Sequence, residues 1–449
     1  MDQWWWKEYP ERDTEYVRWY PPDISPLSSQ NFWADLDVYT PSNLGFYIHV
    51  PFCEEICQFC PYNKFLARDD EIERYLKCLV IELEKYSRFV KPQSVPFIYF
   101  GGGTPSVLSG SQIETVLSNL SHLFPVGADT EITLETNPIT SSQRIEDFYK
   151  AGVNRLSFGI QSFQDNVLKT IGSHHNALDG YRVIDAARDS GFENLGIDLM
   201  FRLPGQSIDD WMNELNKAIE LGLVHVSCYS MILDPLSSLA KSIERGTVQP
   251  QADDKADLEM SRSTLKYMMD KGYMHYASCA SCGHDFAIPG WESRYEKLHW
   301  GAPQVDYLGI GPGAYGFVNK RIYCNQHTLR SYADSVRSGL IPVVAGKHLT
   351  FADQMSRFMV LGLKCIEVSK NKFAESFGID VLDVFGDQIT QLVDWGLIEV
   401  NEEKIRVTDH GRLYIDNISK AFYNKDNYMV SQPLEPELQL LSAQGIWKR

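Results

Sequence analysis

Six apolar, β-rich runs alternate with helical patterns between residues 44 and 233, and this alternation constrains the fold more than any other feature of the sequence. The runs span 44–50, 97–100, 131–135, 155–160, 195–200 and 224–233. Helices placed between strands return the chain across one face of a sheet, so that successive strands run parallel. We therefore expect an α/β fold in which a partial (β/α)6 barrel carries its functional groups at the carboxyl ends of the strands.

The chain divides into five segments by pattern and composition. Residues 1–43 form an N-terminal aromatic arm, whose tryptophans at 4–6 are expected to dock on the core rather than form a binding surface. The barrel over 44–235 is followed by an extension with a glycine-rich loop over 236–348. Helical patterns and two short strand-like pieces indicate a winged-helix-like C-terminal domain at 349–425, which in an acidic chain is expected to cover a site rather than bind DNA. Residues 426–449 form a polar tail.

Composition excludes several classes of function. With 42 Lys and Arg against 59 Asp and Glu, the chain carries a net charge of −17, which repels nucleic-acid phosphates. No apolar run approaches the roughly 20 residues that cross a bilayer, so no membrane partner is expected. The first eight residues lack the apolar region of a signal peptide, and a cytoplasmic location is expected. Nine cysteines, an odd number, favour metal binding or buried thiols over a disulfide framework.

Three cysteines, Cys53, Cys57 and Cys60, directly follow the first strand with the spacing C-x3-C-x2-C. Three thiolates in one loop hold three irons of a [4Fe–4S] cluster and leave the fourth iron without a protein ligand. A small molecule with an amine and a carboxylate chelates that iron. S-adenosylmethionine (SAM) offers both groups, and an electron from the cluster then cleaves its sulfonium. A zinc site is the alternative, but zinc sites usually collect four ligands from paired C-x2-C motifs, and no second pair lies nearby.

Six stretches accompany the cysteine motif in order: YIHVPFC at 47–53, YFGGGTPS at 99–106, ETNP at 135–138, RLSFGIQSF at 155–163, IDLM with LPGQ at 197–206, and DYLGIGPGA at 306–314. With these motifs the chain resembles the radical SAM superfamily, and more narrowly its HemN-like group, named after the oxygen-independent coproporphyrinogen III oxidases. The resemblance covers about 44–420. It implies a radical SAM partial barrel with a HemN-like C-terminal domain, a [4Fe–4S] cluster on the three cysteines, and two molecules of SAM.

Several residues in these stretches are expected to contact SAM. Glycine lets a backbone approach a ligand closely and offer N–H donors, and the resemblance assigns Gly102, Gly103 and Thr104 to the amino-acid end of SAM. Glu135 and Asp198 end strands and are expected to bind the ribose hydroxyls or the ammonium group. Without the resemblance, each carboxylate is better explained as a structural group at a strand end whose hydrogen bonds are satisfied within the protein.

Five more positions complete the expected cofactor site. Tyr47 matches a family position at the first SAM, and Gln161, which follows a strand, is placed similarly. Phe59, between the last two cysteines, is expected to pack on the adenine. By the same resemblance a second SAM lies at the end of the sixth strand near Ile232 and at the glycine-rich loop near Tyr315. A tight turn is the alternative for that loop.

Departures from the family pattern narrow the choice among its branches. Ser173 stands where the family often has an Arg for the SAM carboxylate, so this contact must come from elsewhere. Tyr62 stands where the coproporphyrinogen oxidases carry a fourth cysteine. The haem-chaperone branch carries H-N-x-x-Y-W, and in the aligned stretch YEKLHW at 295–300 only Trp300 is kept.

A local C-x2-C-x-H is formed by Cys279, Cys282 and His284. Such a group binds a metal or flanks a substrate in some proteins. A chance pair of thiols is favoured here, because no second ligand pair is evident.

These departures favour the class C methyltransferase and cyclopropanase branch. There the first SAM yields a 5′-deoxyadenosyl radical that abstracts hydrogen from the methyl group of the second, and the carbon radical adds to an sp2 carbon of a small-molecule substrate. The alternatives are a coproporphyrinogen-oxidase-like oxidoreductase and a haem chaperone. An electron donor such as flavodoxin or ferredoxin is implied, and no protein nucleophile is required. His174, His175, His299 or Tyr315 could accept a proton, although exposed or core roles are favoured for each.

Overall fold

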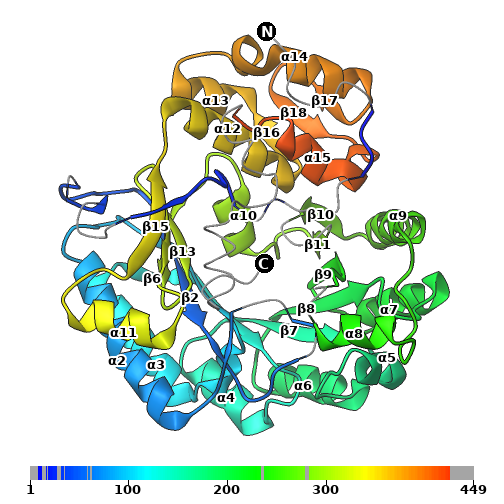
Figure 1. Ribbon diagram of the computed structural model, residues 1–449, viewed down its shortest axis with the longest axis horizontal. Helices are drawn as coiled ribbons and strands as arrows, with labels where there is room; N and C mark the ends of the chain where they lie inside the picture. The colour runs from blue at the N-terminus through cyan, green and yellow to red at the C-terminus, as the bar shows by residue number, and fades with distance from the viewer. Residues whose placement is uncertain are drawn as a thin grey trace.

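Within the described residues, thirteen strands form one curved sheet in the order β1-β15-β14-β13-β12-β2-β5-β6-β7-β8-β9-β11-β10 (Figure 1). The computed structural model describes residues 9–12, 17, 19–27, 32–34, 36–57, 59–60, 63–233, 237–278 and 283–424. The order is linear, with β1 at one edge and β10 at the other, so the sheet is an open arc rather than a closed barrel. The predicted partial barrel is confirmed.

The centre of the sheet is parallel and contains all six predicted strands. They are β2 (Leu44–Val50), β5 (Val95–Gly102), β6 (Val126–Thr136), β7 (Arg155–Gln161), β8 (Asn194–Phe201) and β9 (His225–Ser230). A further strand, β12 (Asp306–Ile310), pairs in parallel with the free side of β2. Sequence patterns did not predict β12, because it lies far from the βα alternation and only tertiary pairing places it beside β2.

Antiparallel strands extend both edges of the parallel centre. One edge continues through β13 (Tyr315–Val318), β14 (Arg321–Asn325), β15 (Val343–His348) and the two-residue β1 (Ser25–Pro26). The other edge continues through β11 (His284–Ala287) and β10 (Met274–Ala277). The two edges are therefore made by segments that the alternating pattern does not include.

Helices cover the convex face of the arc, as Figure 1 shows. They are α2 (Asp69–Tyr86), α3 (Gly110–Leu123), α4 (Ser142–Lys150), α5 (Asp165–Thr170), α6 (Ala177–Asp189) and α7 (Ile208–Glu220). Capping boxes at Ser109, Asn176 and Ser207 fix the starts of α3, α6 and α7, because the side chain at each cap accepts the N–H three residues on. The apolar faces of these helices and the outward side chains of the strands form the main core.

The concave face of the arc is polar and aromatic. Tyr47, Tyr99, Thr133 and Arg155 occupy one row across four neighbouring strands. Side chains alternate between the two faces of a strand, and the residues on either side of Tyr47 are fully buried in the apolar core. The members of this row therefore face inward, into the space that the arc surrounds.

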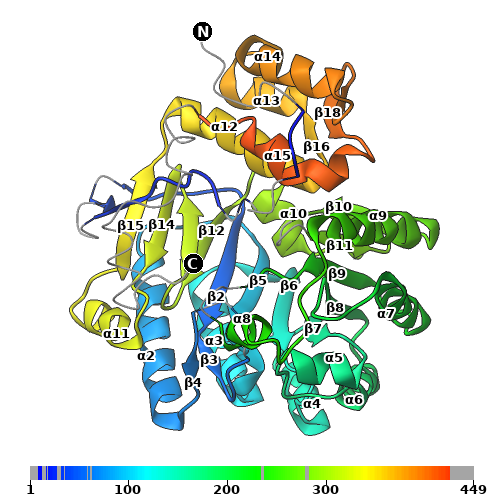
Figure 2. The same ribbon diagram turned by 45° about the vertical axis from the view of Figure 1, so that its right-hand side comes forward.

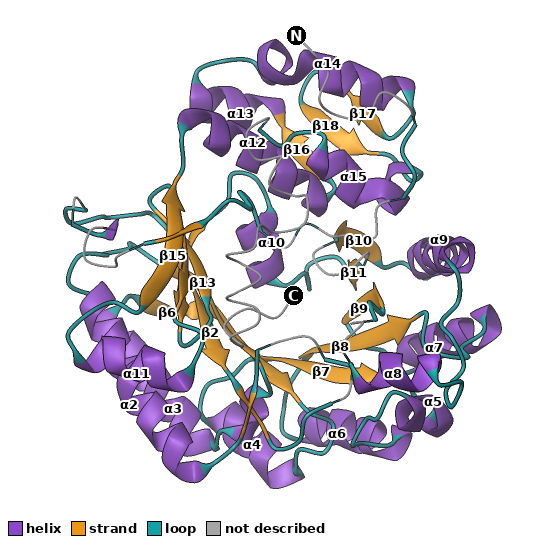
Figure 3. Cartoon of the chain, viewed as in Figure 1, coloured by secondary structure: helices purple, strands orange, loops and turns teal. Residues whose placement is uncertain are grey.

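The C-terminal domain has a core of its own and lies across the open side of the arc (Figure 2). Three strands, β16 (Glu367–Ser369), β18 (Lys404–Val407) and β17 (Ile398–Val400), form an antiparallel sheet in that order. The helices around it are α12 (Phe351–Gly362), α13 (Lys370–Phe377), α14 (Val381–Asp394) and α15 (Ile415–Lys420), as Figure 3 shows. This arrangement confirms the predicted helical domain with a small hairpin.

The remaining elements connect these parts. They are the helices α8 (Ser238–Glu244), α9 (Asp254–Asp270), α10 (Arg294–Trp300) and α11 (Leu329–Arg337), and the 3-10 turns η1 (Pro105–Val107), η2 (Leu363–Cys365) and η3 (Gly411–Tyr414). Helix α10 lies on the concave side of the sheet (Figure 1). The predictions for the tryptophans at 4–6, for Tyr62, for Cys279 and Cys282 and for the tail fall outside the described residues. No helix among the described residues is long and apolar enough to cross a membrane.

Candidate cluster and cofactor site

The cysteine loop begins directly after β2. Cys53 ends β3 (Phe52–Cys53), which pairs in parallel with β4 (Phe65–Leu66), so that the loop between these strands is closed at its base. Cys53 is buried, whereas Cys57 and Cys60 are partly exposed. Lys64 donates to the carbonyl of Cys60 at 2.6 Å and so holds the end of the loop. The three predicted ligands thus lie on one short loop at the carboxyl end of the first barrel strand.

The three thiols lie close enough to influence one another's protonation. Burial, followed by the charges of Cys60 and Cys53, raises the pKa of Cys57 to about 11. Burial also raises the pKa of Cys53, although Thr104 donates its hydroxyl to Cys53 Sγ at 3.4 Å. Within the described part of the chain no three Cys, His, Asp or Glu side chains stand already at metal-ligand spacing. Three neighbouring soft donors without a fourth protein ligand nonetheless fit a [4Fe–4S] cluster that carries SAM on its open iron.

The glycine turn at the end of β5 packs against the cysteine loop. Gly102 has φ +115°, and a Cβ there would lie 2.6 Å from the ring of His49. A Cβ on Gly103 would lie 2.7 Å from the backbone oxygen of Phe52. Gly103 N–H donates to the Val50 carbonyl at 2.8 Å, and Gly102 N–H donates to Glu135 at 3.2 Å. The expected contact of these glycines with the amino-acid end of SAM stays a prediction. These glycines bring two backbones together beneath the loop.

Glu135 and Asp198 lie on the concave face. Tyr99 donates to Glu135 Oε1 at 2.8 Å, and burial raises the pKa of Glu135 above its usual value. Burial, and then the charge of Glu135, raises the pKa of Asp198 to about 7. Ser157 lies within 3.4 Å of Asp198 Oδ1. The expected pair of carboxylates is therefore brought together from β6 and β8, with mutual repulsion that a bound cation or hydrogen-bond donor would relieve.

A buried arginine, Arg155, lies beside these acids. It is 2% exposed, begins β7, and interacts electrostatically with Tyr99 and Asp198. Sequence reasoning missed it as a site residue, although it begins the RLSFGIQSF stretch and shares the inward row of Tyr47. Ser173 does not take over the role of the family's Arg, because its Oγ is bonded to His175 Nδ1 at 2.9 Å.

Gln161 ends β7 in a strained conformation. Its φ of +64° belongs to the left-handed region, which non-glycine residues rarely adopt. The residues that do adopt it often lie at functional sites. Tyr229, from β9, donates to Gln161 Oε1 at 2.6 Å. The backbone thus turns this amide toward the neighbouring strand ends, where the resemblance expects SAM.

A stack of aromatic rings lines the concave face beside the carboxylates. Tyr99 and Tyr295 stack with ring centroids 4.2 Å apart, and Tyr47 stacks on Tyr295 at 5.9 Å. Tyr295, from α10, also stacks on His299 at 5.1 Å. The sequence analysis assigned Tyr47 to the cofactor site but did not identify Tyr99 and Tyr295 as parts of the same aromatic stack. The two-residue alternation of β2 and β5 places Tyr47 and Tyr99 inward, but only the tertiary fold brings α10 onto them.

The residues expected at the second SAM lie on opposite sides of the parallel centre. Ile232 follows β9 and is 43% exposed, whereas Tyr315 begins β13 and stacks on Trp19 at 4.6 Å. Phe59 packs against an apolar cluster at the ends of β8 and β9 that includes Met231. In the linear order of the sheet, β12 and the strands from β2 to β8 separate β13 from β9. A second SAM at these residues stays a prediction.

Both the barrel and the C-terminal domain are similar to known protein families. The profile of the radical SAM superfamily matches residues 47–218, and that of the HemN C-terminal domain matches 349–414. The heme chaperone HemW of Bacillus subtilis is 32% identical over 380 residues, which are 84% of this chain and 98% of that protein. HemW of Escherichia coli is 29% identical, with 84% and 98% covered.

The solved structure of coproporphyrinogen III oxidase (HemN) from Escherichia coli has the same fold. It superposes with a TM-score of 0.79 at 24% identity, covering 92% of this chain and 99% of that one. The expected assignment to the methyltransferase branch gains no support from these similarities. The chain belongs to the radical SAM superfamily, within the HemN-like group that includes the HemW proteins.

Proposed function

We propose that this protein is a HemW-like haem chaperone, which holds a [4Fe–4S] cluster and SAM in its barrel, binds haem, and passes it to an acceptor protein. The observation that carries the proposal is the 32% identity along 98% of a protein named heme chaperone HemW. The haem-chaperone alternative is thus preferred over the methylation or cyclopropanation that the sequence departures favoured, because the relatives named above are heme chaperones.

The residues of the loop and the concave face have distinct tasks in this proposal. Cys53, Cys57 and Cys60 hold the cluster, which when bound offers SAM an open iron and an electron for reductive cleavage. Thr104 donates to Cys53 Sγ and tempers its charge. Tyr99 keeps Glu135 oriented toward the ligand space. Asp198, in its ionised form, accepts a hydrogen bond from a ribose hydroxyl. The protein's part is to bind, orient and exclude water.

Helix α10 supports haem binding despite its departure from the H-N-x-x-Y-W signature. The signature places His four residues before Tyr, whereas this chain has Tyr295 four residues before His299. Residues four apart lie on the same helix face, so the exchange keeps both groups on that face. The ring of His299 contacts Tyr295 at 5.1 Å and Tyr307 at 4.4 Å, and its Nδ1 is buried without a hydrogen-bond partner among the described residues.

The protonation of His299 favours metal ligation. Burial, followed by the charge of Arg357, lowers the pKa of His299 to about 3. The imidazole is therefore neutral at physiological pH, which is the form that binds iron. We assign His299 as the haem ligand and the tyrosines beside it as the surface against which the planar ring packs.

The test uses the anaerobically reconstituted holoprotein, titrated with haem and followed by the Soret absorption. We expect one haem per chain, and the variant His299→Ala should weaken binding by more than tenfold. The exposed His122 provides a matched control, because His122→Ala removes an imidazole from the outer helix α3.

Two results would contradict the proposal. The protein is not a haem chaperone if the wild type takes up no haem. The same conclusion follows if it keeps its haem in the presence of an excess of an apo-haemoprotein acceptor. Formation of S-adenosylhomocysteine together with 5′-deoxyadenosine and a methylated product would instead restore the methyltransferase assignment. Decarboxylation of coproporphyrinogen III would assign the chain to the oxidases.

A further inference from the structure

The place where the family often has an arginine for the SAM carboxylate is taken here by Ser173, whose hydroxyl is already used. Burial lowers the pKa of His175, so its ring is neutral and carries one N–H hydrogen. His175 Nε2 lies 2.9 Å from the Ile160 carbonyl, which can only accept, so the hydrogen is on Nε2. Ser173 Oγ, 2.9 Å from Nδ1, therefore donates its hydrogen to the ring. The Ser173 side chain then has no hydrogen left for a carboxylate, and another residue must hold it.

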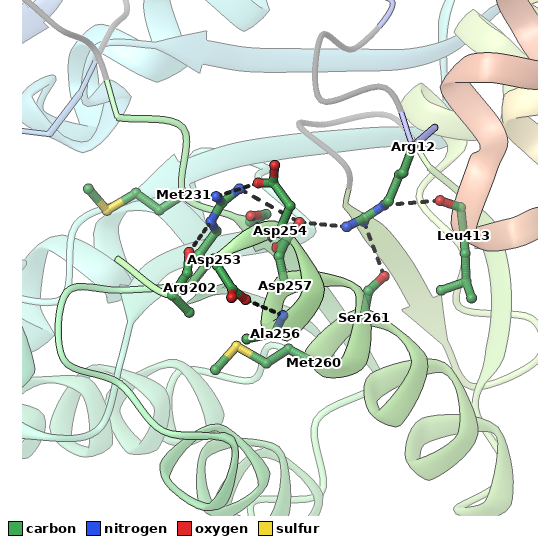
Figure 4. Close-up of polar contacts among 12 residues, drawn as sticks. Arg12, Arg202, Met231, Asp253, Asp254, Ala256, Asp257, Met260, Ser261 and Leu413 are labelled. Carbon is green, nitrogen blue, oxygen red and sulfur yellow. Dashed lines mark hydrogen bonds and ion pairs between the residues drawn. The ribbon is translucent and has the colours of Figure 1, made fainter. Parts of the chain in front are cut away.

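Three other cations near the barrel strands are bound or placed elsewhere. Arg202 follows β8, and its Nη2 donates to Asp254 Oδ1 at 2.6 Å, so its side chain lies over the acidic start of α9 (Figure 4). Lys64 donates to the Cys60 carbonyl at 2.6 Å. Arg155 begins β7 and is therefore at the opposite end of the strands from the cysteine loop. The carboxylate of SAM therefore needs a cation from a different element.

A hollow of about 150 Å³ lies between the cysteine loop and the start of α4. Thr104, Ser106 and Asn137 are among the polar side chains that line it. Thr104 directly follows Gly103, and Asn137 lies two residues after Glu135. Because the resemblance assigns Gly103 and Glu135 to SAM, the hollow borders the expected cofactor site at the carboxyl ends of β5 and β6.

Thr104 connects this hollow to the expected cluster. Its hydroxyl donates to Cys53 Sγ at 3.4 Å, so a group bound in the hollow lies beside one of the three thiolates. Glu54, the next residue after Cys53, lines the same hollow. The amino-acid end of SAM chelates the open iron of the cluster, and the remaining carboxylate oxygen needs a donor from the protein. The hollow thus places its donors next to the cysteine loop.

Arg144, in the first turn of α4, is a cation that lines this hollow. Its Nη2 donates to the Val107 carbonyl at 2.5 Å, which fixes the guanidinium. Its Nη1 lies 3.3 Å from Glu54 Oε1, longer than the roughly 2.8 Å of a strong charge-assisted hydrogen bond. The two side chains are 33% and 53% exposed, so their ion pair contributes little to stability. A ligand carboxylate can therefore replace Glu54 at Nη1 while the Val107 carbonyl keeps the guanidinium in place.

We propose that Arg144 is a cofactor-binding residue, which holds the carboxylate of SAM in the hollow beside Thr104 and takes the role that the family's arginine has at the position of Ser173. Arg144 and Glu54 give the hollow one base and one acid. This pair matches the carboxylate and the amino group of SAM better than it matches a simple anion. The assignment concerns SAM alone and goes beyond the haem-chaperone function proposed above.

The experiment compares SAM with decarboxylated SAM, which keeps the sulfonium, the nucleoside and the amine but lacks the carboxylate. Equilibrium dialysis of the anaerobically reconstituted holoprotein measures both affinities. Arg144→Met should weaken SAM binding by about tenfold, because a charged hydrogen bond is lost, and should change binding of the decarboxylated analogue by less than about threefold. Arg182→Met, which removes an exposed arginine of a surface ion pair on α6, is the matched control and should change neither affinity. Iron content should be the same in all variants.

The double variant Arg144→Met with Ser173→Arg restores an arginine at the family's position. Its charge should again reach the carboxylate, so the affinity for SAM should return to within about threefold of wild type. The decarboxylated analogue, which has no carboxylate, should gain nothing from the second substitution.

The outcomes separate this role from a structural one and from the proposed function. An unchanged affinity for SAM in Arg144→Met, or an equal loss for SAM and for the decarboxylated analogue, would overturn the assignment, because neither result depends on the carboxylate. A double variant that binds SAM no better than Arg144→Met would contradict the claim that the two positions serve the same group. Haem is absent from these measurements, so a failure of the haem-chaperone function leaves them unaffected.

Discussion

Tyr99 donates its hydroxyl hydrogen to Glu135 across the neighbouring strands β5 and β6, at 2.8 Å. The pair joins the aromatic stack of the concave face to the carboxylates expected to bind SAM.

Tyr99→Phe removes the hydroxyl but keeps the ring on Tyr295. Because a hydrogen bond to a carboxylate is stronger than a neutral one, we expect SAM to bind about tenfold more weakly. Equilibrium dialysis of the reconstituted protein measures this, with the exposed Tyr149→Phe as control. Equal affinities in wild type and Tyr99→Phe would refute the role of the pair.

The cluster ligands can be distinguished from the other thiols. Cys57→Ala should lower the iron and sulfide content of the reconstituted protein to a small fraction of wild type and abolish 5′-deoxyadenosine formation, since three thiolates are needed to hold a site-differentiated cluster. Cys365, which is also partly exposed but lies in η2, provides the control variant Cys365→Ala. Iron content that falls equally in both variants would mean that the loss reflects folding rather than ligation.

The raised pKa of Asp198 predicts how stability depends on pH. The folded-state pKa is about 7 and the usual value is 3.8, so the unfolded chain ionises first as pH rises. This group therefore disfavours the folded state progressively between about pH 4 and pH 7. Asp198→Asn should remove that contribution, so that the variant gains stability over wild type at pH 8 but not at pH 4.

Urea denaturation of the apoprotein at several pH values measures the difference. The exposed Asp209→Asn on α7 should show no such gain. Parallel stability curves for wild type and Asp198→Asn would exclude a raised pKa in the folded protein.

Glu82 holds the glycine-rich loop from beneath. Its carboxylate is fully buried in α2 and accepts the Gly311 N–H at 3.0 Å, the Asn325 amide at 2.8 Å and the Tyr332 hydroxyl at 2.6 Å. Glu82→Ala leaves three donors without their acceptor, and we expect a loss of roughly 3 kcal/mol or more in unfolding free energy. Glu84→Ala, two residues on and exposed, should change it by less than about 0.5 kcal/mol. Denaturant titration tests both, and a cost below 1 kcal/mol for Glu82→Ala would contradict this role.

Local patterns predicted the parallel core well. The strand and helix periods lie within short windows of sequence, and they predicted all six parallel strands, β2 and β5 to β9, although β6 begins at Val126, five residues before its predicted start. The positions of Glu135 and Asp198 near strand ends followed from the same patterns. The acceptors of the Gly102 and Gly103 N–H groups could not be predicted in this way, because the acceptor of a backbone donor depends on the segment packed against it. Here Glu135 accepts from Gly102, and the Val50 carbonyl accepts from Gly103.

The sequence by itself determined the βα alternation, the cysteine loop and the family, since each is written in residues that are close along the chain. Only the tertiary structure decided that β12 completes the parallel set, that α10 brings Tyr295 onto Tyr99, and that Arg12 meets Asp257. These contacts join residues separated by more than 190 positions, so they depend on how the twisted sheet curves and which edges it leaves open. The same curvature places other side chains around Asp198, and the desolvation that raises its pKa is a property of the assembled fold rather than of any local segment.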